Sequence, residues 1–201
     1  MILFLIGILI GLVIAAPMGP VGVLCARKTL EYGIAGTLAV GIGTALADAI
    51  YAGLTVFGLA TISEFVLKHA VYIKLIGGTL LFILAIKEYY SKTPIKDTIK
   101  ITPKGCLAIS ATTFLITLLN PIGIISFIAI FAMLGDQLLH NQHAIYVVIG
   151  VFVGSLSWFI ILGRIIHYTR HLVPDYIILS IRKISALFFA IFGAWAFLSL
   201  L

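Results

Sequence analysis

Long apolar stretches alternate with short polar segments along the whole chain. Six of these stretches contain about 20 residues or more, the length that an α-helix needs to cross a ~30 Å hydrocarbon core. Charged residues, glycines and prolines mark their ends, and the pattern predicts helices near residues 2–26, 36–62, 71–90, 106–134, 144–166 and 177–200. We therefore expect an all-α, polytopic membrane protein with six transmembrane helices.

One connection differs from the others. The segment "SKTPIKDTIKITPKG" at residues 91–105 is polar, rich in lysine and punctuated by Pro94 and Pro103, whereas the remaining connections are short. It divides the chain into a first three-helix unit at residues 1–90 and a second at residues 106–201. We expect the polar segment to be a cytoplasmic loop.

The composition agrees with a protein that lies in a bilayer. Hydrophobic residues make up 62% of the 201 positions and charged residues 10%, too few to cover a surface that faces water. The net charge of +6 belongs to bases that flank the apolar stretches, so nucleic-acid binding is not expected. The N-terminus lacks the positive region of a signal peptide, and the first helix is expected in the mature protein. Two cysteines, Cys25 and Cys106, do not suggest a disulfide framework.

The basic residues are distributed unevenly among the connections. The first, third and fifth connections, with the adjoining helix ends, hold Arg27, Lys28, Lys87, Lys92, Lys96, Lys100, Lys104, Arg164, Arg170, Arg182 and Lys183. The second and fourth hold Lys68 and Lys74. Because bases accumulate on the cytoplasmic side of a membrane, the odd connections are predicted to be cytoplasmic and both termini to lie outside the cytoplasm.

The two halves share sequence features in the same order. "MGPVG" and "LNPIG" carry Pro and Gly at the same spacing, in the first helix of each unit. The glycine-rich "GIGTALADAIYAG" aligns with "GVFVGSLSWFIILG", and "KLIGGTLLFILAI" aligns with "KISALFFAIFGAW". Because each unit has three helices, an odd number, the second copy must insert upside down relative to the first. The matches predict two inverted three-helix repeats, the architecture of many secondary transporters.

Each unit also carries a helix-breaking motif at the corresponding position: Pro17, Gly19 and Pro20 in the first, Asn120 and Pro121 in the second. Proline inside a membrane helix removes a backbone hydrogen bond, and the freed carbonyls must find partners in protein or in a water-filled cavity. Paired interruptions of this kind are candidates for the binding site of a transporter. The alternative is that these residues only kink the helices or allow close packing.

Asp48 lies deeper in a predicted helix than any other acid or base, about 12 residues or roughly 18 Å from the cytoplasmic end. Ionisable groups at that depth usually mark a pathway for an ion, a proton or a substrate. A proton and a cationic substrate group could compete for its carboxylate, which would couple transport to a proton gradient. Alternatively, Asp48 could simply bond a neighbouring threonine or a backbone amide at a helix break.

Two polar stripes accompany these candidates. The stripe around Asp48 follows the spacing of one helix face and contains Gly41, Thr44, Tyr51 and Thr55. The second stripe leads to the second break and contains Ser110, Thr113, Thr117 and Asn120. The two stripes could line one cavity, or their hydroxyls could join helices, as hydroxyls commonly do in membranes.

The segment "APMGPVGVLCARKTLEYGIAGTLAVGIGTALADAIYAGL" (16–54) resembles the N-terminal signature of the lysine exporter (LysE/RhtB) family of bacterial amino-acid efflux permeases, and "LLNPIGIISF" (118–127) resembles its Asn-Pro motif. The resemblance covers essentially the whole chain. It implies an exporter of amino acids or close derivatives, driven by the proton motive force, in a bacterial inner membrane. Two positions depart from the family pattern, Ala47 where Gly is frequent and Ile122 where many members have Lys.

The resemblance assigns the transport site by residue: Pro17, Gly19, Pro20, Asp48, Asn120 and Pro121, to which the stripes add Thr44, Tyr51 and Thr117. The expected partners are an amino acid, as the small-molecule substrate, and the lipid bilayer. Glycine spacings such as Gly150 and Gly154 fit packing within one subunit or in a homo-oligomer. No phosphate-binding loop is present, so ATP hydrolysis is not expected. We also expect no other enzymatic activity and no cofactor.

Two other functions were considered. A metal-ion or other inorganic-ion exporter of the same wider superfamily would be expected to carry several intramembrane acids or histidines, whereas only Asp48 lies that deep. His140 and His143 are expected to be ordinary loop residues. A thiol oxidoreductase would need equivalent cysteines in the two repeats, and Cys25 and Cys106 do not occupy equivalent positions.

Overall fold

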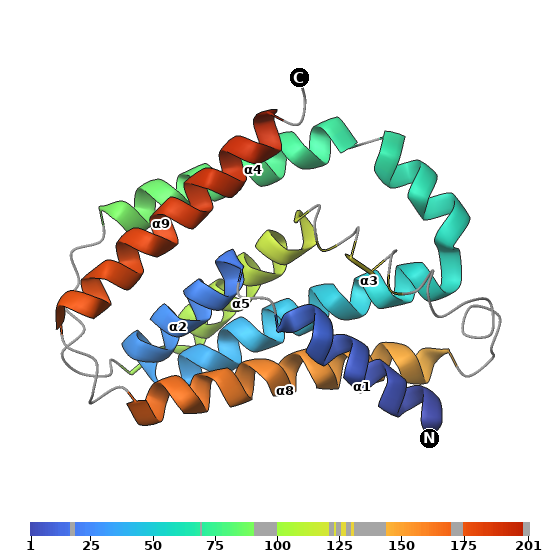
Figure 1. Ribbon diagram of the computed structural model, residues 1–201, viewed down its shortest axis with the longest axis horizontal. Coiled ribbons are helices and arrows are strands. Elements are labelled where there is room, and N and C mark those ends of the chain that lie inside the picture. The colour runs from blue at the N-terminus through green and yellow to red at the C-terminus, as the bar shows by residue number, and fades with distance from the viewer. Residues whose placement is uncertain are drawn as a thin grey trace.

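The computed structural model is a bundle of α-helices (Figure 1). It describes residues 1–16, 19–68, 70–90, 100–120, 123, 126–127, 130, 144–169 and 175–198. The helices are α1 (Ile2–Ala15), α2 (Pro20–Tyr32), α3 (Ile34–Lys68), α4 (Ala70–Tyr89), α5 (Pro103–Leu118), α8 (Ile145–Thr169) and α9 (Asp175–Leu198). The described residues contain no strand, and the all-α class is confirmed.

Two of these helices are long and apolar enough to cross a bilayer: residues Ile34–Val56 within α3, and α8. Shorter apolar helices lie at Ile2–Ala15, Leu75–Lys87 and Pro103–Leu118. Within the described residues, length and hydropathy therefore identify two spans, and the number of six remains a prediction. The predicted helix starts at 36, 71, 144 and 177 lie within two residues of those of α3, α4, α8 and α9.

The expectation of one helix over residues 2–26 is wrong, because this stretch forms two helices. α1 ends at Ala15, and α2 begins at Pro20 with Gly19 as its extended N-cap residue. Proline is tolerated at the first position of a helix, where its missing N–H would have no intrahelical partner. Pro20 therefore starts a new helix rather than kinking a continuous one, and α2 extends to Tyr32.

The contacts between helices cross the two halves of the chain. α1 packs against α8, α3 packs against both α8 and α5, and α4 packs against α9. Figure 1 shows α4 and α9 side by side along one edge of the bundle. α2 contacts α3, α8 and α9 and so connects the α4–α9 pair to the rest of the bundle.

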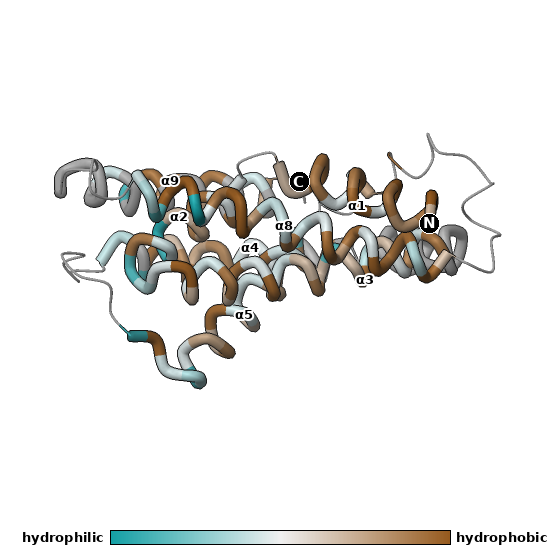
Figure 2. Tube along the Cα trace, turned by 90° about the horizontal axis from the view of Figure 1, so that it is seen from below, coloured by the Kyte–Doolittle hydropathy of each residue, from teal (hydrophilic) through white to brown (hydrophobic). Residues whose placement is uncertain are grey.

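Glycines allow α1 and α8 to approach closely. A Cβ atom added to Gly7 would lie 2.9 Å from the Cα of Gly150, and one added to Gly154 would lie 2.9 Å from the Cα of Ile8. Real Cβ atoms essentially never make contacts this short, so the two backbones touch where side chains are absent. Figure 2 shows that α1 is hydrophobic along almost its whole length. The glycine spacing in α8 therefore serves packing within one subunit.

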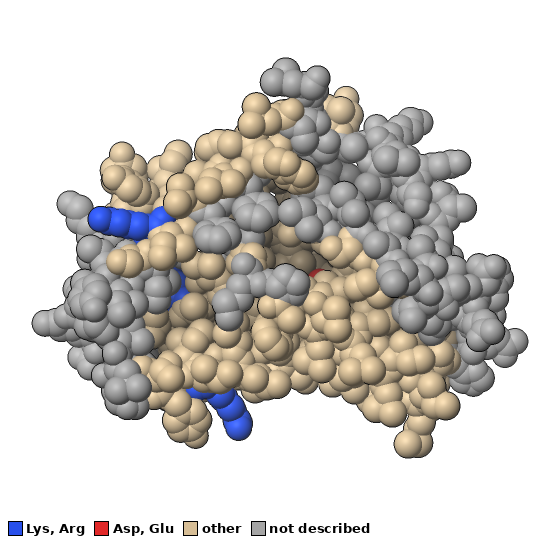
Figure 3. Space-filling model, viewed as in Figure 1, with Lys and Arg blue, Asp and Glu red and all other residues tan. Residues whose placement is uncertain are grey.

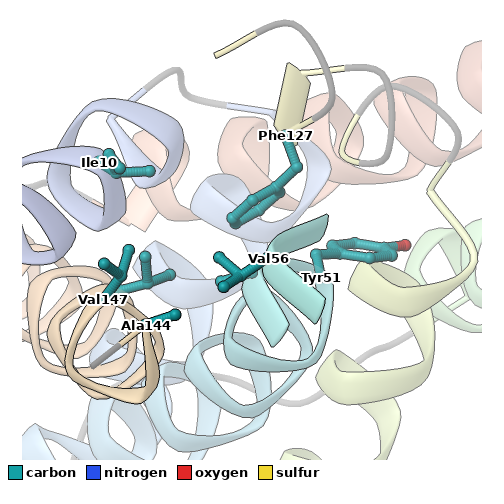
Figure 4. Close-up of a cluster of buried hydrophobic side chains, with 8 residues drawn as sticks. Ile10, Tyr51, Val56, Phe127, Ala144 and Val147 are labelled. Atoms are coloured by element: carbon teal, nitrogen blue, oxygen red, sulfur yellow. The ribbon is translucent and has the colours of Figure 1, made fainter. Parts of the chain in front are cut away.

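Buried apolar side chains join the helices in separate clusters. The largest contains Ile10 of α1, Val56 of α3 and Val147 of α8, with Phe127 packed on them (Figure 4). A second cluster joins α2, α4, α5 and α9 through Leu24, Ala85, Ile116 and Phe189. These clusters position both the middle of α3 and the end of α5.

Among the described side chains, Lys and Arg gather at one end of the face drawn in Figure 3. This is the end where α2 and α4 finish and where α5 begins (Figure 1). Acidic atoms are visible on that face at one small place inside a hollow (Figure 3). On this face, the described charges therefore lie at one end and at one point inside the hollow.

Candidate functional site

Asp48 is buried in the middle of α3, with 3% of its surface exposed. Ser155 of α8 donates a hydrogen bond from its hydroxyl to Oδ2 of Asp48 at 2.6 Å. Ser155 is itself fully buried. An acidic side chain in an apolar helix is thus held by a hydroxyl from a helix of the other half of the chain.

The stripe predicted around Asp48 does form one buried face of α3. Thr44, Tyr51 and Thr55 are all buried, and Gly41 packs against Phe159 of α8. The hydroxyls of Thr44 and Thr55 donate to carbonyls one turn back in their own helix, at 3.0 Å and 2.7 Å. The hydroxyls of both threonines therefore bond within α3. Of this face, Asp48 and Tyr51 are the residues whose side chains bond other helices.

Tyr51 connects this face to the second break. Its hydroxyl lies 3.0 Å from the carbonyl oxygen of Thr117 and 2.5 Å from that of Leu118, the last two residues of α5. Both carbonyls are at the helix end; that of Thr117 also accepts from the Asn120 N–H at 3.1 Å, and no described N–H bonds that of Leu118. In Figure 4 the Tyr51 hydroxyl points away from the apolar cluster that holds its ring. A side chain from α3 thus donates to a carbonyl that has no backbone donor among the described residues.

Thr117 has a second feature of interest. Its hydroxyl oxygen is buried and has no hydrogen-bond partner among the described residues. Buried polar groups are nearly always hydrogen-bonded, and each exception in a native structure requires an explanation. A polar ligand or a water molecule beside the helix break could form a hydrogen bond with this hydroxyl.

The other members of the second stripe have a different role. Ser110 donates to the carbonyl of Ala39 on α3 at 2.7 Å. The Thr113 hydroxyl lies 3.0 Å and 3.1 Å from the carbonyls of Ile109 and Ser110 in its own helix, and 3.4 Å from that of Val40 on α3. Ser110 therefore joins α5 to α3, one of the two roles expected from the sequence, whereas Thr113 chiefly bonds its own helix.

The first break lies one turn beyond the contact between α1 and Ser155. A Cβ atom at Gly11 would come within 2.8 Å of the Ser155 amide nitrogen, and α1 ends four residues later at Ala15. Gly19 is partly buried, and a Cβ added there would meet no described atom within 4 Å. The start of α2 therefore lies in the same region of the bundle as the Asp48–Ser155 pair.

Several predicted site residues cannot be compared with the structure. Pro17 and Pro121 lie outside the described residues, as do His140 and His143, and the side chain of Pro20 is not described. Asn120 follows Leu119, the C-cap residue of α5, and is partly buried. Both cysteines are free thiols, Cys25 buried in α2 and Cys106 partly exposed in α5. In the part of the chain that the structure describes, no three His, Cys, Asp or Glu side chains form a metal-binding group.

Ser155 was not predicted as a site residue. It lies in "GVFVGSLSWFIILG", the segment that the internal repeat aligns with the Asp48 segment. The sequence therefore offered one indication of this residue, a polar side chain close to the position that aligns with Asp48. The pairing itself depends on how α3 and α8 are rotated against each other, which the repeat does not specify.

The all-helical fold of the described residues, with two helices long and apolar enough to cross a bilayer, fits an integral membrane protein. The comparison with protein families is specific: residues 12–199 match the LysE type translocator family, and the chain belongs to this family. The resemblance found in the sequence is thereby confirmed. The comparisons with curated proteins and with solved structures found no match.

Proposed function

We propose that the protein is a secondary active exporter of amino acids or close derivatives, coupled to the proton motive force, in the inner membrane of a bacterium. Membership of a translocator family supports export, and the sequence resemblance supports amino acids as the solute. The observation that carries the proposal is Asp48, a buried carboxylate inside an apolar helix whose one described hydrogen bond comes from a neutral hydroxyl. Such a group can exchange a proton for an organic cation.

In this mechanism, Asp48 alternates between two partners. When it is ionised, it accepts the Ser155 hydrogen bond and binds the ammonium group of the amino acid. When a proton binds from the outer side, the carboxyl group becomes neutral and its attraction for the ammonium group is lost. Proton and substrate therefore compete for one carboxylate, and each proton that enters releases one solute molecule.

The helix breaks supply the remaining contacts. We propose that the N-terminus of α2, at Gly19 and Pro20, binds the substrate carboxylate, because the N–H groups that follow Pro20 in the first turn have no intrahelical partner and the helix dipole favours an anion there. The unsatisfied hydroxyl of Thr117 provides a hydrogen bond to the same substrate. Pro17, Asn120 and Pro121 would keep these helix ends open, while Thr44 and Tyr51 support the face that carries Asp48.

The proposal includes two inverted repeats, residues 1–90 and 106–201, and the helix contacts support it. The first helix of one half packs on the second helix of the other in both directions, since α1 packs on α8 and α5 on α3. The third helices, α4 and α9, pack on each other. If α1, α3 and α4 are exchanged with α5, α8 and α9, the same pairs of helices are in contact. The basic end of the bundle would face the cytoplasm, with both termini outside.

The test is efflux from proteoliposomes loaded with labelled amino acids, with and without a pH gradient across the membrane. The intact protein should release one class of amino acid faster under the gradient. Asp48→Asn should abolish this acceleration, and Ser155→Ala should reduce it. The matched control is Thr79→Ala, which removes an exposed hydroxyl that bonds only its own helix. Equal gradient-driven efflux by intact protein and Asp48→Asn would refute the role of Asp48.

The same vesicles test the alternative of an inorganic-ion exporter. If no amino acid moves although the protein is folded and inserted, the vesicles are loaded with divalent metal ions instead. Metal efflux that depends on Asp48 would replace the amino-acid proposal.

A further inference from the structure

A cavity of about 170 Å³ lies between α2, α4 and α5, away from the Asp48–Ser155 pair. Its polar lining consists of Arg27 and Lys28 of α2, Lys87 of α4 and Thr112 of α5. The rest of the lining is apolar and includes Leu24 and Leu84. Three basic side chains from two helices thus face one small cavity with a hydrophobic wall.

The described lining of the cavity holds more basic than acidic side chains. Arg27 and Lys28 both bond Glu31, each at 2.7 Å. Lys87, an exposed residue of α4, adds a third base to the lining. Around the cavity, the described side chains therefore sum to a net positive charge.

Lys28 is the most buried of the lysines that line the cavity. The side chain of Lys28 is only 17% exposed, and burial of its ammonium group lowers the pKa of Lys28 although Glu31 opposes the shift. Lys28 lies outside the apolar stretches that span the bilayer, at the basic end of the bundle. An anion in the cavity would give Lys28 and Lys87 a counter-charge at short range.

We propose that this cavity binds a single oxyanion carried on an apolar body, with the oxyanion at Lys28, Lys87 and Thr112 and the apolar body against Leu24 and Leu84. Two sources have this chemistry: the phosphate of an anionic phospholipid and the carboxylate of an apolar amino acid. Basic pockets between membrane helices at the cytoplasmic side are known to suit anionic lipid headgroups. The site does not depend on the transport role assigned to Asp48.

The experiment measures thermal unfolding of the purified full-length chain in detergent while a ligand is titrated. The first arm compares phosphatidylglycerol with phosphatidylcholine, whose headgroup has no net charge. The second arm compares L-leucine with L-leucinamide, which lacks the carboxylate. The double variant Lys28→Gln/Lys87→Gln removes two of the three bases. Lys104→Gln is the matched control, because Lys104 is an exposed base on α5 at the same end of the bundle but outside the cavity.

We expect one anionic probe to raise the unfolding temperature of the intact protein and of Lys104→Gln, and its affinity to fall at least about tenfold in the double variant. The arm in which this occurs identifies the source of the oxyanion. Lys87→Gln alone is measured as well, since it leaves the Lys28–Glu31 bond intact and tests the site if the double variant does not fold. Equal affinities of both probes for Lys87→Gln and Lys104→Gln would overturn the proposal.

Discussion

Replacement of Tyr51 by Phe tests whether one hydroxyl stabilises the break that follows α5. The substitution removes one oxygen and keeps the ring, which packs on Phe127 with a centroid separation of 5.5 Å. The hydroxyl lies within hydrogen-bond distance of the carbonyls of Thr117 and Leu118. Tyr51 is 5% exposed, so water does not readily replace the lost donor.

The magnitude follows from what the substitution leaves behind. A side-chain hydrogen bond between membrane helices is worth about 0.6 kcal/mol on average, which by itself would be a small effect. The Thr117 carbonyl also accepts from the Asn120 N–H at 3.1 Å, so Tyr51→Phe leaves the Leu118 carbonyl without its described donor, and a buried unsatisfied group costs about 1–3 kcal/mol. We therefore expect the free energy of unfolding to fall by about 1–3 kcal/mol.

The assay is reversible unfolding in mixed micelles, with amide hydrogen exchange at the last turn of α5 as a local measurement. Tyr89→Phe is the control, because Tyr89 is exposed at the end of α4 and loses the same atom. Exchange should accelerate in the last turn of α5 in Tyr51→Phe only. If both variants unfold at the same free energy as the intact protein, the carbonyls at the break do not depend on Tyr51.

Three further predictions use the same unfolding measurement. Gly150→Ala should lower the free energy of unfolding by about 1–3 kcal/mol, because the new Cβ would lie 2.8 Å from the Cα of Gly7. Gly53→Ala is the control and should not lower it, because its Cβ would meet only Val148, at 4.0 Å. Thr117→Val removes a hydroxyl that has no described partner, so the free energy of unfolding should stay equal or rise by up to about 1 kcal/mol. Amino-acid efflux should fall in this variant, and efflux equal to that of the intact protein would exclude Thr117 from the site. Burial alone would raise the pKa of Glu31, but Lys28 and Arg27 outweigh it and hold that pKa below its usual value of 4.5. The stabilisation that ionised Glu31 contributes is therefore present above about pH 4.5 and is lost as the pH falls through the lower pKa of the folded state. Glu31→Gln should flatten this part of the plot of unfolding free energy against pH, whereas the exposed-site variant Lys104→Gln should not.

The features that local chemistry determines could be predicted from the sequence. Proline has no N–H, so an interruption near Pro20 followed from residue type alone, although the sequence did not indicate that α2 would start there as a separate helix. The burial of Thr44, Asp48, Tyr51 and Thr55 followed from helical spacing, because residues three and four apart share one face.

The features that depend on the contact between distant helices could not be predicted. Ser155 bonds Asp48 across 107 positions, and Tyr51 reaches α5 across 66 and 67 positions. Such pairs require a particular rotation and depth of each helix, which no single stretch of sequence contains. The same reason explains why Ser110, which belongs to a stripe with the spacing of a cavity wall, bonds the backbone of α3.

The close contact between α1 and α8 has a consequence for the order in which the protein is made. About 130 residues separate the end of α1 from the start of α8, and at roughly 5–20 residues per second the ribosome needs about 7–26 seconds to supply them. During that time the glycine face of α1 has no helix partner. Because α1 contains only apolar residues and glycine, lipid can cover this face without leaving a polar side chain unsatisfied, and α8 then displaces the lipid. The last major contact of α1 is therefore made late in synthesis, and a nascent chain that stops before residue 145 should hold α1 in the membrane as a separate helix.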